Sequence, residues 1–456
     1  MPAADMRDLL TDALKGHDAD YVEIRLEEGE ATRVAYRGKE LEDIGRTSTL
    51  GGCVRALVKG GWGFASFNDT SDLAGKVRAA VRGARLAGYQ KSCLAPVEPV
   101  VDTVLARPAR APWTVSVDEK VRVLNEYNGL LWSEPQIQTT MIRYADSRRV
   151  VTFASSEGTY IQQEKGDLAV VFFALARDGA DVQQAHLSLG SAGDFTVMED
   201  LDDRIRETSR RAVALLKARP VKGGVYTVVA DPGLAGVFAH EAFGHLSESD
   251  FVYENERIKE LMVLGKRFGS SELNIVDGAA VPGLRGSYEY DDEGVPARKT
   301  YLIKEGVLVG RLHSRETAGR MGEPVSGNAR AISYRHAPIV RMTNTYIEPG
   351  KVTFDAMLSD IKEGIYAKDS FGGETSMEMF TFSAGEAYMI RNGRLEEMVR
   401  NVNLTGNVFE TLLHIEAIGD DLGWNQGGGC GKGEQSPLPV GDGSPHIRIH
   451  NVVIGG

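Results

Sequence analysis

The pattern of apolar and polar residues divides the first half of the chain into two segments with the same order of elements. In the first segment, a helical pattern at residues 6–14 precedes alternating stretches such as YVEIRLEE, and a helical stretch, SDLAGKVRAAVRGARLAGY, closes it. In the second segment, helical residues 117–131 precede stretches such as QTTMIRYAD, and DLDDRIRETSRRAVALLKA is again helical. Because alternation indicates half-buried strands, we interpret the two segments as a duplicated α+β unit of helix, antiparallel strands and helix.

Two breaks in this pattern mark the predicted domain boundaries. The first, LAPVEPVVDTVLARPARAPW, contains four prolines, a composition that favours a semi-extended connector. The second, KARPVKGG, closes a helical pattern before a strand begins. We predict an N-terminal α+β unit at residues 1–93, a proline-rich linker at 94–113, a second α+β unit at 114–220 and a C-terminal domain at 221–456.

The pattern beyond residue 225 favours strands separated by glycine turns, with little helix after His245 except at residues 355–363. KTYLIKEGVLVGRLHS and EMFTFSAGEAYMIRNGRLEEMVRN predict hairpins that turn at KEG and RNG. One helix is expected in ADPGLAGVFAHEAFGH, because Asp231 is a suitable N-cap and Pro232 a suitable first helical residue. The sequence therefore predicts an α+β protein with a large, mainly antiparallel β C-terminal domain that carries this helix.

Composition and charge argue against nucleic-acid and membrane partners. A chain of 456 residues is too long to fold around one compact core, so we expect more than one domain. The chain is acidic, since 52 Lys and Arg against 64 Asp and Glu give a formal net charge of −12. An acidic chain without a long basic run predicts no nucleic-acid partner. No stretch approaches the roughly 18 apolar residues of a membrane span, and the N-terminus lacks a signal-peptide pattern. We expect a cytoplasmic protein without a membrane partner, and the three cysteines fit a reducing compartment.

The stretch HEAFGH holds His240, Glu241 and His245, with one residue more than the HExxH motif of zinc peptidases. On an ideal α-helix the two histidines would lie about 140° apart and could not share a metal ion. A π-bulge brings residues i and i+5 onto one face, and Gly244 eases such a bulge or an early helix end because it lacks a Cβ. Glu241 would then lie beside the metal and could take a proton from bound water. The alternative is a pair of polar residues on a half-buried helix.

A third ligand is needed, because catalytic zinc usually has three protein ligands and one open position. Cys430, in WNQGGGCGKGEQSP, has glycine on both sides, so its thiol can approach a metal ion without hindrance from neighbouring side chains. The loop lacks the spacing of a phosphate-binding P-loop, and a flexible turn with an incidental cysteine is the remaining alternative. Cys53 lies in a strand pattern and Cys93 at a helix-to-linker junction, so we expect neither to bind metal.

Several stretches resemble the TldD/PmbA family, also described as modulators of DNA gyrase, and specifically its TldD branch, which carries a metal motif. In chain order they are HEAFGH, DDEGVPARKTYLIKEGVLVGRLHS, SGNARA, RMTNTYIEPG, LTGN and CGKGEQSPLPVGDGSPHIRIHNVVIGG. They cover most of the chain after residue 225, and their order and spacing agree with the family as well as their content.

The resemblance implies a zinc-dependent peptidase that acts on unfolded or small peptides inside a cavity enclosed by a dimer. It implies His240, His245 and Cys430 as zinc ligands and Glu241 as the general base. The dimer would be a homodimer or a heterodimer with a PmbA-like paralogue, whose branch lacks the metal motif. The alternative hypothesis is a non-catalytic dimeric binding or modulator subunit in which the metal is structural or absent.

Overall fold

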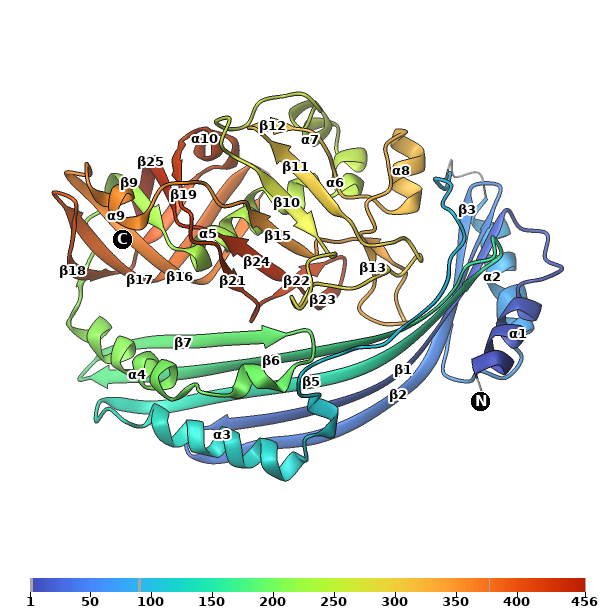
Figure 1. Cartoon of the computed structure of the whole chain (residues 1–456), viewed down its shortest axis with the longest axis horizontal. Coiled ribbons are helices and arrows are strands. Elements are labelled where there is room, and N and C mark those ends of the chain that lie inside the picture. Colours follow the sequence, from blue (N-terminus) through green and yellow to red (C-terminus); the bar gives the residue numbers. More distant parts are fainter. Residues whose placement is uncertain (1–2, 89–91, 377, 456) are drawn as a thin grey trace.

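The chain forms a long curved sheet and a β-rich C-terminal region that lies on the concave side of that sheet (Figure 1). The computed structural model describes residues 3–88, 92–376 and 378–455. Helices and strands are both abundant, and most strand pairs are antiparallel. This confirms the predicted combination of helices with mainly antiparallel sheets.

The curved sheet is shared by the two predicted α+β units. Its strands are β1 (Tyr21–Arg37), β2 (Glu40–Val58), β3 (Gly61–Phe67), β5 (Ile137–Ser155), β6 (Tyr160–Asp178) and β7 (Asp181–Ser191). The order is β3-β2-β1-β5-β6, and β7 also pairs with β6. β1 and β5 pair without interruption from Glu23 opposite Ser155 to Arg37 opposite Met141. The two segments that repeat in the sequence therefore lie side by side in one sheet.

Helices pack against this sheet near its two ends, each pair over its own core (Figure 1). The helices are α1 (Ala3–Ala13), α2 (Leu73–Ala87), α3 (Val117–Leu131) and α4 (Asp202–Lys217), with short 3-10 turns η1 (Pro112–Thr114) and η2 (Phe195–Met198). Leu10 and Val77 pack with strand residues at one end, and Leu124 and Ile205 do so at the other. Each segment thus follows the predicted order of helix, three strands and helix.

The proline-rich linker contributes a strand of its own. β4 (Val101–Val104) pairs in parallel with the start of β6, Val101 opposite Tyr160. Proline lacks a backbone N–H, so the linker's prolines lie outside this short paired stretch. Part of the linker thus belongs to the curved sheet.

The C-terminal region contains two main sheets. The larger comprises β8 (Arg219–Pro220), β9 (Gly224–Ala230), β16 (Glu363–Ser376), β17 (Met379–Arg391), β18 (Arg394–Arg400), β19 (Asn403–Asn407), β20 (Ile415–Ile418) and β25 (Ile447–Gly455). The smaller comprises β10 (Ile275–Gly278), β11 (Lys299–Lys304), β12 (Val307–Leu308), β15 (Asn344–Ile347), β21 (Gly423–Asn425) and β24 (Gly441–Ser444). β16 pairs with both β9 and β17, and β25 and β19 complete the circuit, so the larger sheet closes on itself.

Two short hairpins accompany these sheets, and the helical content after His245 exceeds the prediction. The hairpin strands are β13 (Ala329–Arg330) with β14 (Ile339–Val340), and β22 (Gly429–Lys432) with β23 (Gln435–Pro439). Besides α9 (Phe354–Leu358), near the predicted 355–363, the region holds α6 (Ser249–Glu254), α7 (Glu256–Leu261), α8 (Arg315–Met321) and α10 (Val408–Leu413). Helix is thus a minor part of this region, as expected, but α6, α7, α8 and α10 were not foreseen, because helices this short carry too few turns for a clear apolar period.

The hairpin turns at KEG and RNG are confirmed. Glu305 and Gly306 both have positive φ between β11 and β12, as do Asn392 and Gly393 between β17 and β18. Positive φ at both central residues is the geometry of a tight two-residue hairpin turn. Among the described residues, none of the helices has the length and apolar character needed to cross a bilayer.

Candidate metal centre

The helix predicted around HEAFGH lies between the two C-terminal sheets. α5 (Pro232–Phe238) begins after Asp231, whose side chain accepts a hydrogen bond from the Leu234 N–H, as expected of an N-cap. The helix continues as a π-helix over Ala239–Gly244 and ends in a 3-10 turn over His245–Ser247. We call residues 232–247 the metal helix. It contacts β16 on one side and β15 and β24 on the other.

The π-helical turn brings the two histidines together. The N–H of His245 donates to the carbonyl of His240, five residues earlier, in place of the usual four. The two imidazole rings then lie with centroids 5.3 Å apart and nearly perpendicular. The distortion required by the extra residue of HEAFGH is therefore present, both as a π-bulge and as an early end of the regular helix.

Gly244 has a different role from the one expected. Its φ of −57° and ψ of −53° are ordinary helical values, so the backbone there does not need glycine's freedom. A Cβ at this position would instead lie 2.1 Å from the sulfur of Met342, far inside van der Waals contact. Gly244 thus permits Met342 to pack directly against the π-helical turn.

Cys430 lies on β22, the first strand of the hairpin formed by β22 and β23, which we call the Cys430 hairpin. Its Sγ is 3.5 Å from Nε2 of His245, and ligand atoms of His240, His245 and Cys430 all lie within 4.8 Å of one another. Ligands at about 2.0–2.3 Å from a tetrahedral zinc ion are roughly 3.3–3.6 Å apart. The 3.5 Å between Cys430 and His245 matches this separation, and the two-nitrogen, one-sulfur donor set suits zinc.

Buried carboxylates orient both imidazoles. Nδ1 of His240 lies 2.8 Å from Oδ1 of Asp442 on β24, and Nδ1 of His245 lies 3.0 Å from Oε2 of Glu248. Both Nε2 atoms are left for the metal side, an arrangement typical of zinc-bound histidines. The sequence prediction missed both carboxylates. Glu248, three residues after His245, was visible as a helical neighbour, whereas Asp442 comes near only through the sheet.

Lys432 completes the polar surroundings of the site. Its Nζ lies 3.0 Å from Glu248 Oε2 and 2.6 Å from Asp250 Oδ1. Burial raises the pKa of Glu248, but the charges of Lys432 and His245 outweigh it, so the net pKa is lowered. Glu248 therefore stays ionised and can hold the N–H of His245.

The three candidate ligands also affect one another's protonation. Burial raises the pKa of the Cys430 thiol, but hydrogen bonds and charge from His240 and His245 outweigh it and bring the pKa to about 5. Burial lowers the pKa of His245, but Glu248 and Cys430 raise it, to about 9. The thiolate is thus held between two imidazoles, and a divalent cation can replace their protons.

Glu241 faces a cavity of about 400 Å³ beside the candidate ligands. Its side chain is 30 % exposed, and Oε2 lies 3.9 Å from Nε2 of His245. Burial raises the pKa of this carboxyl, while the neighbouring histidines oppose the rise. A carboxylate so placed can accept a proton from a molecule bound next to the histidines. The cavity is lined by Glu241, His245, Leu246, Phe251, Asn255, Ile258, Gly373, Glu374, Thr375, Gly431, Lys432 and Gly433.

The other two cysteines lie apart from the site. Cys53 is buried in β2, and burial raises the pKa of its thiol to about 11. Cys93 is exposed. Neither belongs to the metal-ligating group found among the described residues, which consists of His240, His245 and Cys430.

Comparison with protein-family models decides the family of the chain. Residues 223–456 match the PmbA/TldA metallopeptidase C-terminal domain, 22–86 match domain 1 and 110–218 match the central domain. This chain belongs to the TldD/PmbA family. The resemblance drawn from HEAFGH, RMTNTYIEPG and the other stretches is therefore confirmed.

Relatives of this TldD/PmbA chain include proteins named as metalloproteases. A metalloprotease of Synechocystis is 50% identical over 440 residues, which cover 96% of this chain and 95% of that protein. A zinc metalloprotease TldD homolog of Saccharolobus solfataricus is 33% identical over 343 residues, 75% of this chain and 76% of that protein.

Solved structures share the fold at low sequence identity. TldE of Thermococcus kodakarensis is 18% identical with a TM-score of 0.78, and the match covers 99% of this chain and 100% of that one. A Thermotoga maritima protein described as a proposed modulator of a DNA gyrase has a TM-score of 0.80 at 18% identity, with the same coverage. These matches establish the family fold.

Proposed function

We propose that this protein is a zinc-dependent peptidase of the TldD type. The observation that carries the proposal is the convergence of two imidazole nitrogens and one thiol sulfur within 4.8 Å, beside a cavity that Glu241 faces. His240, His245 and Cys430 would hold zinc and leave its fourth position toward the cavity. When bound, zinc would supply an activated water and a Lewis acid for the peptide carbonyl.

Glu241 would act as the general base. Its partial exposure and its place next to His245 let it take a proton from the attacking water and deliver it to the leaving amine. The raised pKa of its carboxyl favours this exchange, because a base whose pKa is nearer neutrality also returns the proton more readily.

An extended peptide is the substrate that best fits the cavity. Leu246, Phe251 and Ile258 form an apolar wall, and Gly373 to Thr375 of β16 line the cavity as well. In this part of β16 the described backbone pairs run to β17, which leaves the other edge of the strand for a substrate. A peptide added as a strand would be recognised by its backbone, and this favours unfolded or small peptides over folded proteins.

Hydrolysis of a quenched fluorescent peptide tests the mechanism. We expect Glu241→Gln to reduce kcat about 10²–10⁴-fold while the zinc content stays at that of the wild type, because the variant loses the base but keeps the ligands. Glu272→Gln, at an exposed glutamate away from the cavity, is the matched control. Full activity of Glu241→Gln would refute the mechanism. Zinc-loaded wild type without activity on a broad peptide library would favour the non-catalytic modulator instead.

We also propose that the first half of β2 contributes to a dimer, either with a second copy or with a PmbA-like paralogue. Among the described residues, β3 pairs only with the part of β2 from Gly52 onward, so the earlier part of β2 pairs with β1 along one edge and with no described strand along the other. Leu41, Ile44 and Leu50 are exposed there by 43%, 47% and 53%. Exposed apolar residues on a free strand edge are typical of an association surface.

Light scattering after size-exclusion chromatography tests this surface. The double variant Ile44→Lys, Leu50→Lys should run as a monomer or lose its partner, because it places charge on the apolar edge. Leu86→Lys, at an 89% exposed leucine on α2, is the control and should leave the mass unchanged. An unchanged dimer in the double variant would place the interface elsewhere.

A further inference from the structure

Arg341, the first residue of RMTNTYIEPG, is a buried cation bound to the Cys430 hairpin. Its exposure is 0%, and its guanidinium donates to the carbonyl of Cys430 at 2.7 Å and to that of Gln435 at 3.0 Å. These carbonyls belong to the two opposing strands of the hairpin. Among the described residues, no carboxylate lies within ion-pair distance of Arg341. Both of these hydrogen bonds are therefore made to the backbone of the hairpin that carries Cys430.

A buried arginine without an acidic partner is costly, and an apolar residue of similar size would serve stability as well or better. The planar guanidinium offers what an apolar residue lacks, because it fixes two carbonyls at once in a rigid geometry. At this position the fixed carbonyls are those of Cys430 itself and of the opposing strand. The charge is thus placed where it determines the position of one candidate ligand.

The next residue, Met342, contacts the other ligand-bearing element. Its sulfur occupies the space where a Cβ of Gly244 would lie, directly before His245. Side chains of successive residues in an extended segment point to opposite sides. The preceding residue takes part as well, because the carbonyl of Val340 accepts a hydrogen bond from Lys432 of the hairpin at 2.9 Å. Three consecutive residues thus contact both the metal helix and the Cys430 hairpin.

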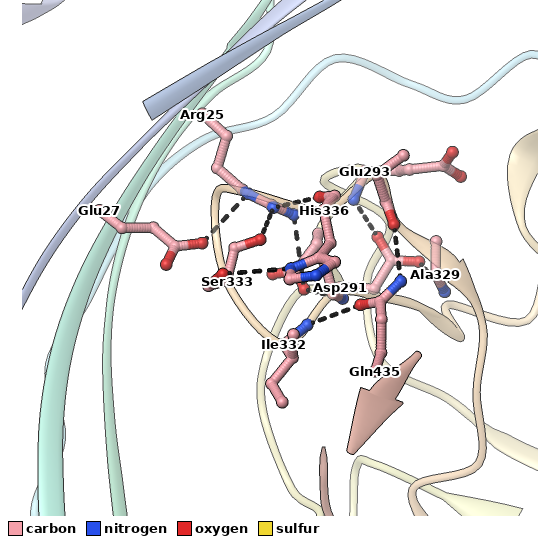
Figure 2. A network of polar contacts seen from close by, with 12 residues as sticks. Arg25, Glu27, Asp291, Glu293, Ala329, Ile332, Ser333, His336 and Gln435 are labelled. Carbon is pink, nitrogen blue, oxygen red and sulfur yellow. Dashed lines mark hydrogen bonds and ion pairs between the residues drawn. The ribbon is translucent and has the colours of Figure 1, made fainter. Parts of the chain in front are cut away.

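The hairpin is also tied to the curved sheet, through Gln435 (Figure 2). The Gln435 side chain accepts from the Ile332 N–H at 2.9 Å and donates to the Ala337 carbonyl at 3.1 Å. Arg25 of β1 holds the same loop by donating to the carbonyls of Ser333 and His336. The hairpin is therefore anchored on both sides, and Arg341 and Met342 form the side that faces the metal helix.

We propose that Arg341 and Met342 are positioning residues that set the distance between the histidine pair and Cys430. Arg341 holds the sulfur ligand in place through the hairpin backbone, and Met342 holds the π-helical turn at His245. The inference rests on the metal site proposed above, and it assigns the geometry of that site to two side chains that do not bind the metal.

Cobalt binding tests the role of Arg341. Co²⁺ in the zinc site reports the thiolate through a sulfur-to-cobalt charge-transfer absorption. We expect Arg341→Met to lose much of this absorption and to bind zinc about 10–100-fold more weakly in chelator competition, as when partners of metal ligands are removed. Arg341→Lys keeps the positive charge but cannot donate to two carbonyls in the planar geometry of a guanidinium. Its cobalt absorption and zinc affinity should therefore lie between those of the wild type and Arg341→Met. Arg55→Met, which removes a buried arginine paired with Glu23 and Glu293, should lower the Tm but leave the cobalt spectrum unchanged.

A reciprocal pair of variants tests Met342 in a way that does not depend on Arg341. Met342→Ala should weaken zinc binding because it removes the sulfur that packs on the turn, and Gly244→Ala should weaken it because its Cβ collides with that sulfur. The double variant should lose less than the sum of the two single losses, because both changes act through this one contact. Wild-type zinc affinity in Met342→Ala, or a cobalt spectrum of Arg341→Met equal to that of the wild type, would overturn the inference while the metal site stands. Wild type that binds neither metal would overturn both.

Discussion

The metal helix and the Cys430 hairpin place their candidate ligand atoms by different physical means. In the helix, two candidate ligands five residues apart are brought together by one extra residue in a turn, so the backbone hydrogen bonds fix their separation. In the hairpin, the single candidate ligand is held by Arg341, whose guanidinium donates to the carbonyls of Cys430 and Gln435. Local ligands can be positioned by helix geometry, whereas a distant ligand needs a buried polar framework.

The largest loss of zinc binding is expected when one candidate ligand is removed, either from the metal helix or from the Cys430 hairpin. His240→Ala and Cys430→Ser should each reduce zinc affinity by more than about 100-fold and abolish peptidase activity, because a site with two remaining protein ligands holds zinc weakly. Zinc titration with a competing chelator, together with circular dichroism, measures binding and folding separately. Unchanged zinc binding in Cys430→Ser would show that Cys430 is not a ligand and that the hairpin does not belong to the metal site.

A smaller effect is expected from the carboxylates that orient the imidazoles. Asp442→Asn and Glu248→Gln should each weaken zinc binding about 10–100-fold, because each carboxylate fixes the ring and the tautomer of one histidine. Asp442 reaches its histidine from a strand, and Glu248 from the end of the metal helix. Equal losses of zinc affinity would show that a carboxylate on a strand and one at the end of the helix orient their histidines equally well. Wild-type affinity in both variants would contradict the assigned orientation.

The smallest effect concerns the start of the metal helix. Burial and the nearby charge of Asp369 raise the pKa of Asp231 from 3.8 to about 7, although backbone N–H groups of Leu234 and Asp369 oppose the rise. The folded state therefore binds this proton more tightly than the unfolded state, and the resulting stability is lost as the pH rises from about 4 to 7. Asp231→Asn keeps a capping oxygen and never ionises.

Thermal unfolding at two pH values checks this prediction. The Tm of Asp231→Asn relative to wild type should be higher at pH 8 than at pH 5, whereas Asp231→Ala should lose about 1 kcal/mol of stability through the missing cap. Asp118→Asn, at an exposed position on α3, serves as the control. The same Tm difference at both pH values would show that Asp231 does not titrate in this range.

The sequence was most informative where the structure depends on near neighbours. Asp231 and Pro232 predicted the start of the metal helix, and the spacing of His240 and His245 predicted its distortion. The reason given for Gly244 was wrong, since its close contact is with Met342, about a hundred residues away. Such a contact leaves no local pattern in the sequence.

The parts that escaped prediction all depend on distant segments. Asp442 and Arg341 look like ordinary polar residues in the sequence, and only the tertiary fold places them beside His240 and the Cys430 carbonyl. The repeated pattern predicted the order of elements in each half of the curved sheet, but alternation says nothing about which strand lies beside which. Pairing of β1 with β5 could therefore not be foreseen.

The pairing of β1 with β5 has a consequence for synthesis of the chain on the ribosome. β1 can pair with β2 as soon as both have emerged, but its other edge, from Glu23 to Arg37, is covered only when residues up to Ser155 are available. Until then the nascent chain presents a long unpaired strand edge, the kind of surface that joins neighbouring chains. A stall or truncation shortly after residue 93 would leave that edge permanently open, so the early fragment should require a chaperone to stay unaggregated.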